Sequence, residues 1–95
     1  MRFEWDEAKS HSNRKKHGIS FGLSTEVFAD PFCLTIPDLV SEGEQRFWTI
    51  GHIENVTLVL VVHATRDQEG EEIVRIISAR KATPRERRLY EEATQ

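Results

Sequence analysis

The pattern of apolar and polar positions at the start of this 95-residue chain predicts a short strand followed by a helix. Residues 3–5 alternate apolar and polar side chains, which is typical of a strand. Asp6 then provides an N-cap for a helix over residues 7–17, because its carboxylate can accept from the free backbone N–H groups of the first turn. Gly18 provides the left-handed residue that commonly ends a helix.

Two further helices carry recognisable start signals. Ser20 can cap a helix with an apolar stripe formed by Phe21, Thr25 and Phe28, and this helix should end before Pro31. The last helix, residues 84–93, begins after Thr83 and carries glutamate at its third position, which is a capping box. A proline at its first position fits there because the missing N–H would have no partner in any case. We expect Leu89 and Tyr90 to dock this helix on the body, with its arginines pointing outward.

Between these helices the hydrophobic period changes toward two, which favours strands. A strand over residues 32–36 and a polar loop over 37–45 precede three strand-like runs at 46–53, 56–65 and 72–81. The second run is apolar on both alternating faces, which is typical of a central strand that is covered on both sides. The order of elements predicts an α+β fold: an antiparallel sheet with two N-terminal helices and one C-terminal helix.

Composition and length predict a single globular domain over residues 1–95. The hydrophobic fraction of 38% and charged fraction of 31% are ordinary for a soluble protein. The longest apolar run is too short to cross a bilayer, and the N-terminus does not resemble a signal peptide, so we expect a cytoplasmic protein without a membrane segment. The lone cysteine, Cys33, lies in an apolar segment and is expected to be a small buried hydrophobe.

The net charge of −3 conceals a segregation of charge along the chain. Residues 1–20 carry five basic and three acidic side chains, residues 21–72 carry two and ten, and residues 73–95 carry six and three. Two basic ends can create a local positive surface despite the negative total. The side chains expected to bind RNA phosphates there, unless they form only solvated surface, are Arg14, Lys15, His17, Lys81 and Arg85.

A candidate catalytic group lies on the predicted sheet. If the Glu54-Asn55 turn contains no bulge, Arg46 lies opposite His63. A seven-residue connection to the next strand places His63 opposite Arg75, whereas a shift of one residue sends Arg75 to the other face. Two arginines beside an imidazole could cleave RNA without a metal, because the cations stabilise transition-state charge and the imidazole transfers a proton.

Other proton-transfer candidates are Lys16, His17 and Glu54, provided that the end of the first helix comes near the sheet. A structural role for His63 is the plain alternative, since a histidine at the end of an apolar strand is often part of the core. The histidines (His11, His17, His52, His63) show no zinc-binding spacing, and the chain has no glycine-rich phosphate loop. We therefore expect neither a metal nor a cofactor.

Three segments together resemble the BrnT toxin family. They read FEWDEAK at 3–9, NRKKHGISF at 13–21, and RIISARKAT at 75–83 leading into Arg85-Glu86-Arg87. This resemblance implies a RelE-like fold and a type II toxin: a ribonuclease that blocks translation and is neutralised by a BrnA-like antitoxin with a ribbon-helix-helix domain. It also implies that operator DNA is contacted only through the antitoxin. The polar positions that the resemblance marks for testing are Lys16, His17, Arg46, His63, Arg75, Ser78 and Arg80.

Two other functions remain open at this point. A non-catalytic RelE-like module that binds an antitoxin and acts as a co-repressor would have the same fold. A direct DNA-binding surface formed by the basic ends is a third possibility, although the sequence contains no helix-turn-helix signature. Toxicity and RNA cleavage by the chain alone separate the first of these from a ribonuclease.

Overall fold

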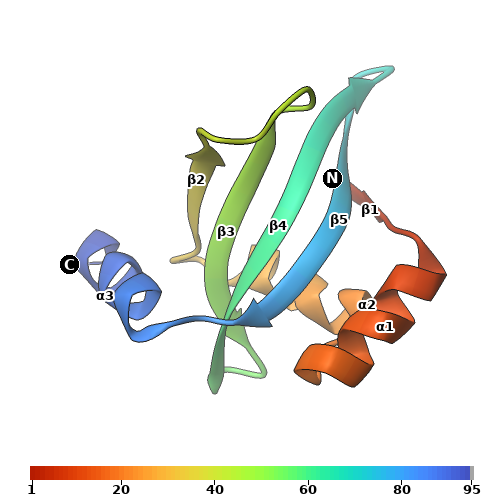
Figure 1. Ribbon diagram of the computed structural model, residues 1–95. Helices are drawn as coiled ribbons and strands as arrows, with labels where there is room; N and C mark the ends of the chain where they lie inside the picture. The colour runs from red at the N-terminus through yellow and green to blue at the C-terminus, as the bar shows by residue number, and fades with distance from the viewer. Residues whose placement is uncertain (95) are drawn as a thin grey trace.

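The computed structural model describes residues 1–94 and forms one five-stranded sheet with helices on both faces (Figure 1). The elements follow in the order β1 (Arg2–Glu4), α1 (Glu7–His17), α2 (Phe21–Ser24), the 3₁₀ helix η1 (Thr25–Ala29), β2 (Leu34–Asp38), β3 (Arg46–Ile53), β4 (Thr57–Gln68), β5 (Glu71–Lys81) and α3 (Pro84–Ala93). The predicted bounds of α1, β3 and α3 are confirmed. No helix among the described residues is long and apolar enough to cross a membrane.

Local capping explains why the long helices begin and end where they do. The Asp6 carboxylate accepts from the Lys9 N–H at 3.1 Å, and Gly18 adopts a φ of 76° while its N–H donates to the Arg14 carbonyl at 2.8 Å. At the start of α3, Thr83 and Glu86 form both hydrogen bonds of a capping box. These interactions lie within a few residues of each other, so the sequence alone predicts them.

The second helix differs from the prediction because it changes period after one turn. Ser20 caps it as expected, but α2 is followed by the 3₁₀ helix η1. The Ser24 and Thr25 hydroxyls each donate to a carbonyl three residues back at 2.7 Å, which competes with α-helical bonding. The buried stripe consequently repeats every three residues, as Phe21, Ser24 and Val27, instead of the predicted Phe21, Thr25 and Phe28.

The sheet has the strand order β1-β5-β4-β3-β2. The four later strands pair antiparallel, as predicted, whereas β1 pairs parallel with β5, so the sheet as a whole is mixed. Strand β2 lies two residues later than expected. Strands β4 and β5 are longer than predicted. They are joined by a tight turn at Glu69 and Gly70, whereas the sequence predicted a longer connection over residues 66–71.

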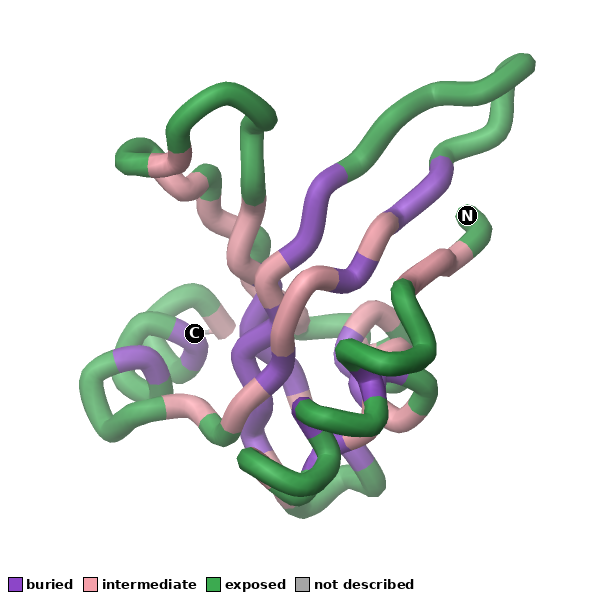
Figure 2. Tube along the Cα trace, turned by 45° about the vertical axis from the view of Figure 1, so that its right-hand side comes forward, coloured by how far each residue is buried: buried purple, intermediate pink, exposed green. Residues whose placement is uncertain are grey.

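On one face of the sheet, helices cover the part near the β3–β4 turn and leave the part near the β4–β5 hairpin uncovered (Figure 1). Figure 2 shows that the buried residues are concentrated in the centre of the strands. On that face α1, α2 and η1 enclose a core that includes Phe21, Val27 and Val61. On the other face Tyr90 of α3 packs against Leu60 and neighbouring apolar side chains. Strand β4 is therefore covered on both faces as predicted, whereas Leu89 remains 42% exposed and does not dock.

Candidate functional site

The turn between β3 and β4 sets which side chains share a face. Ile53 pairs with Thr57, so three residues, 54–56, lie in the connection, and Glu54 and Asn55 both have positive φ values. Phe47 therefore lies opposite His63, and the prediction that Arg46 lies opposite His63 is wrong. Because side chains alternate along a strand, this shift of one residue places Arg46 on the face that His63 does not occupy.

The pairing of β4 with β5 places Arg75 on the same face of the sheet as Arg46. Ala64 pairs with Arg75, and His63 pairs with Ile76. An irregularity at His63 leaves Ile77 as an extra residue in β5, which is a β-bulge. The second of the two predicted registers is therefore the observed one. Arg46 and Arg75 flank the small side chain of Ala64 on the face opposite His63, so the expected row of Arg46, His63 and Arg75 does not form.

Both arginines line a hollow of about 290 Å³ on the open part of this face. Asp6 and Lys9, from the start of α1, line the same hollow. Arg46 and Lys9 are exposed and Arg75 is half-exposed, so the positive charges face solvent. Sequence reasoning did not assign a role to Lys9, and its only signal was a place in the family-like segment at residues 3–9.

A carboxylate from the loop between β2 and β3 contacts Arg75 from an adjoining hollow, which Glu44, Arg66 and Arg75 line together. The Glu44 side chain forms an ion pair with the Arg75 guanidinium, and the two side chains are 50% and 43% exposed. The sequence does not identify Glu44, because it lies in a polar loop 31 residues away from its partner. The site therefore combines cations with a group that can accept a proton.

On the face of the sheet that carries Arg46 and Arg75, the next row of side chains is half-buried. Trp48, Val62 and Ser78 lie side by side across β3, β4 and β5. The predicted RNA-binding residue Ser78 thus lies on the same face as the arginines. Trp48, which the sequence analysis did not single out, offers an aromatic surface of the kind on which unpaired bases stack.

His63 belongs to the core on the helix-covered face. It is only 3% exposed, its Nε2 lies 2.7 Å from the Thr49 hydroxyl, and Phe28 and Phe47 pack against its ring. Burial lowers the pKa of His63 to about 4, so the ring is neutral at physiological pH. Its geometry matches the structural alternative considered from the sequence.

Arg80 lies on the open face but is engaged in holding α3. Its guanidinium donates to both carboxylate oxygens of Glu86, at 2.8 and 2.9 Å. This contact with Arg80 is the main reason why the pKa of Glu86 is lowered. The Arg80–Glu86 pair joins β5 to the first turn of α3 and is primarily structural.

The remaining proton-transfer candidates do not converge on the hollow. Glu54 lies in the turn at the far end of β3, eight residues after Arg46, which is roughly 25 Å along an extended strand. Lys16 and His17 lie in the last turn of α1, whereas Lys9 lies in its first turn. The proposed grouping of Lys16, His17 and Glu54 with the arginines is therefore not observed.

The predicted phosphate-binding residues lie in the last turn of α1, at the end of β5 and in the first turn of α3. The Asn13 amide donates to the carbonyls of Ile19 and Ala79, at 2.7 and 2.8 Å, and thereby ties the C-terminal half of α1 to β5. The basic residues of these three segments are exposed, except for partly buried His17: Arg14, Lys15, Lys16, His17, Lys81 and Arg85. They can contact an RNA backbone but lie away from the Arg46 hollow.

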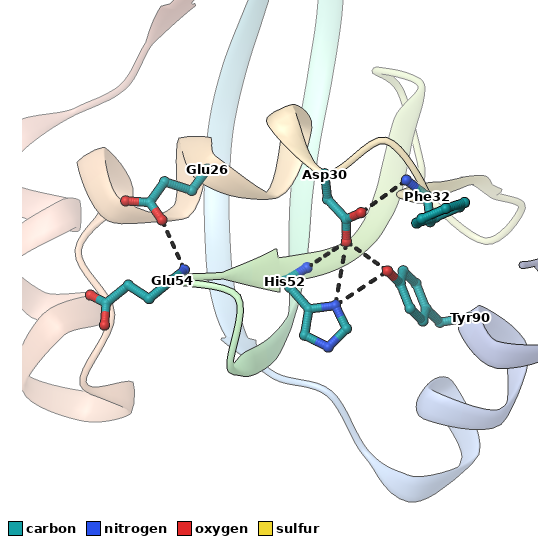
Figure 3. A network of polar contacts seen from close by, with 6 residues as sticks. All are labelled: Glu26, Asp30, Phe32, His52, Glu54 and Tyr90. Atoms are coloured by element: carbon teal, nitrogen blue, oxygen red, sulfur yellow. Dashed lines mark hydrogen bonds and ion pairs between the residues drawn. The ribbon is translucent and has the colours of Figure 1, made fainter.

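A larger pocket, of about 480 Å³, lies elsewhere and is lined by acidic side chains (Figure 3). The Asp30 carboxylate accepts from the His52 N–H at 2.9 Å and the Tyr90 hydroxyl at 2.7 Å. Burial alone would raise the pKa of Asp30, but these hydrogen bonds hold it below its usual value. Burial and the contact with Asp30 raise the pKa of Tyr90 to about 12.

Two more carboxylates, Glu26 and Glu54, line this pocket, and no lysine or arginine does so. Phosphate would be repelled there, so this pocket is not a candidate RNA-cleavage site. Its network instead fixes α3 to the end of η1 through Tyr90. Within residues 1–94, no group of three or more histidine, cysteine, aspartate or glutamate side chains is arranged to hold a metal ion.

Comparisons with known proteins agree with this fold. A family model described as the ribonuclease toxin BrnT of type II toxin-antitoxin systems matches residues 5–86. The crystal structure of the Brucella abortus ribonuclease toxin BrnT is similar, with a TM-score of 0.66 and 28% identity, covering 87% of this chain and 97% of that chain. No curated protein sequence matches the chain. The family match includes Lys9, Glu44, Arg46 and Arg75.

Proposed function

Because this chain belongs to the BrnT family of ribonuclease toxins of type II toxin-antitoxin systems, we propose that it cleaves RNA without a metal and thereby inhibits translation. The observation that carries the proposal is the hollow on the open sheet face, where Arg46 and Arg75 meet Lys9. A phosphodiester placed there would contact guanidinium and ammonium groups, which are the usual partners of phosphate in proteins.

The geometry supports a specific division of roles for transesterification. The Glu44 carboxylate accepts the proton of the ribose 2′-hydroxyl, and the 2′-oxygen forms a bond to phosphorus while the bond from phosphorus to the 5′-oxygen breaks. Arg46 and Arg75 stabilise the charge on the phosphoryl oxygens during this exchange. The Lys9 ammonium donates a proton to the departing 5′-oxygen, so that a 2′,3′-cyclic phosphate and a 5′-hydroxyl result.

Other parts of the chain would position the substrate. Stacking on Trp48 and a hydrogen bond to Ser78 would orient a base and its ribose beside the arginines. Basic residues of α1, of the end of β5 and of the first turn of α3 would contact phosphates further along the RNA: Arg14, Lys15, Lys16, His17, Lys81 and Arg85. Arg80 holds α3 in place through its pairing with Glu86.

A protein antitoxin follows from the family, since type II systems pair a toxin with a protein. We propose a BrnA-like antitoxin with a ribbon-helix-helix domain, which would contact operator DNA on behalf of the complex. The alternative of a non-catalytic co-repressor predicts the same binding without RNA cleavage.

The test is to induce the chain alone and together with the product of its neighbouring gene, and to map RNA ends at single-nucleotide resolution. We expect growth arrest and new 5′-hydroxyl ends only when the chain is induced alone, and cleavage by the purified chain in EDTA. An Arg46→Ala variant that still folds should lose both effects. Absence of toxicity and of new ends would leave the co-repressor function; cleavage that stops in EDTA would refute metal independence.

A further inference from the structure

A second pocket, of about 250 Å³, lies on the face of the sheet opposite the arginines. Figure 1 shows that the helices stop short of the part of the sheet beside the β4–β5 hairpin. Phe28 of η1 lines the pocket. Its floor consists of buried His63 and Val74, its walls are the half-buried rings of Phe28 and Phe47, and Thr65 is on its exposed rim. The pocket is therefore mainly apolar and open on one side.

One polar atom of His63, which lines this pocket, has no partner. The Nε2 of His63 is used by the Thr49 hydroxyl, which in turn lies 2.8 Å from the Thr35 hydroxyl. The other ring nitrogen, Nδ1, is buried and makes no hydrogen bond to any part of the described chain. Buried polar atoms are nearly always satisfied in native proteins, so an unpaired one beside a pocket indicates a missing group.

The size and chemistry of the pocket define what would fit. An engineered apolar cavity of about 150 Å³ holds benzene, so the present volume accommodates a six-membered ring with a polar tip. A phenol is the best match, because its hydroxyl can donate to an unprotonated Nδ1 or accept from a protonated one. Aromatic rings with a single polar group are also typical anchors of protein interfaces.

We propose that this pocket receives a tyrosine side chain of the antitoxin, whose hydroxyl pairs with His63 Nδ1. Because Nδ1 is buried, the half-buried rings of Phe28 and Phe47 must move aside to admit the hydroxyl. The rim residue Glu72 and the adjacent β4–β5 hairpin are acidic, with Asp67, Glu69 and Glu71 exposed, so the residues flanking the tyrosine are basic. This inference rests on the protein partner in the proposed function, but it concerns the face of the sheet opposite the arginine hollow.

The pocket is tested by filling it. Thr65→Trp places an indole at the mouth, and Gln68→Trp adds the same group on the other face of the same hairpin as a charge-matched control. Calorimetry with the purified product of the neighbouring gene should show binding at least tenfold weaker for Thr65→Trp and unchanged for Gln68→Trp. Both variants should keep the far-ultraviolet circular dichroism and RNA cleavage of the parent chain. Equal affinity for the two variants would overturn the proposal.

A second measurement tests the hydrogen bond without the antitoxin. p-Cresol, which reproduces the tyrosine side chain, should shift the ring signals of Phe28, Phe47 and His63 in nuclear magnetic resonance spectra. Toluene, which lacks the hydroxyl, should bind roughly tenfold more weakly, as expected for leaving a buried polar group unpaired. Equal binding of the two probes, or no shift with p-cresol, would refute the role of Nδ1.

These results are separable from those that test RNA cleavage. If the chain cleaves no RNA but loses its partner through Thr65→Trp, the proposed ribonuclease function fails and the pocket assignment stands. If the chain cleaves RNA and Thr65→Trp binds its partner normally, the pocket assignment fails and the ribonuclease function stands.

Discussion

Replacing Arg75 by alanine provides a quantitative test of the RNA-cleavage site. A unit charge about 4 Å from the transition-state phosphate contributes about 1 kcal/mol in water and about 4 kcal/mol at the effective dielectric constant near a protein surface. Arg75 is 43% exposed, so its contribution should lie between these limits. Because about 1.4 kcal/mol corresponds to a factor of ten, Arg75→Ala should slow RNA cleavage by about fivefold to a thousandfold.

The same substitution should barely change stability. The pairing between Arg75 and Glu44 is exposed, and such ion pairs contribute at most about 1 kcal/mol. The assay follows cleavage of a fluorogenic RNA in EDTA and the free energy of unfolding in urea. Arg66→Ala is the matched control, since Arg66 forms a comparable exposed pair with Glu4, and it should lose stability equally but keep its activity. A cleavage rate for Arg75→Ala within threefold of the parent would refute our assignment.

Four further predictions concern single residues. Glu44→Gln should lower the cleavage rate by about 10² to 10⁴ without weakening RNA binding in a filter assay; faster cleavage would mean that Glu44 only blocks Arg75. Burial lowers the pKa of His63 to about 4, against 6.5 in the unfolded chain, so the free energy of unfolding should fall by up to about 3 kcal/mol as the pH drops from 6.5 toward 4. Urea unfolding at several pH values should show a smaller fall for His63→Gln, and an equal fall would contradict this. Asn13→Ala should cost about 2–4 kcal/mol in urea unfolding, because two buried carbonyls lose their donor; a cost below 1 kcal/mol would exclude that role. Gly51→Ala should lower the free energy of unfolding by about 1–3 kcal/mol, because a Cβ would lie 2.9 Å from the Val27 carbonyl oxygen. An unchanged melting temperature would show that η1 can move away from β3 without loss of stability.

Much of the fold could be predicted because its signals are local. The caps at Asp6, Gly18 and Thr83 lie beside the helices they limit, and the apolar run in β4 reports burial on both faces. The parallel pairing of β1 was not predictable in this way, since its partner β5 lies about 70 residues away. The change of period at Ser24 was missed because a hydroxyl that bonds to its own helix has no distinctive sequence pattern.

The candidate site was only partly predictable for a related reason. Arg46 and Arg75 were identified as charged residues near strand ends, but their common face depends on a three-residue turn and a bulge. His63 was grouped with them because a turn without a bulge is the simpler assumption. Lys9 comes from a helix that only the folded chain brings to the hollow, and Glu44 comes from a loop that only the folded chain brings to Arg75. The sequence thus indicated which types of residue the site uses, but not which of these residues the fold brings together.

The extra residue in β5, Ile77, implies that strand length matters as much as residue identity in this protein. Losing the codon for residue 77 would leave every charged group in the chain and almost all of its hydrophobicity intact. Yet the residues before that point would exchange inward and outward positions relative to β4, and Arg75 would turn toward the core. Homologues with insertions or deletions in this strand should therefore be inactive or carry a compensating change in length nearby.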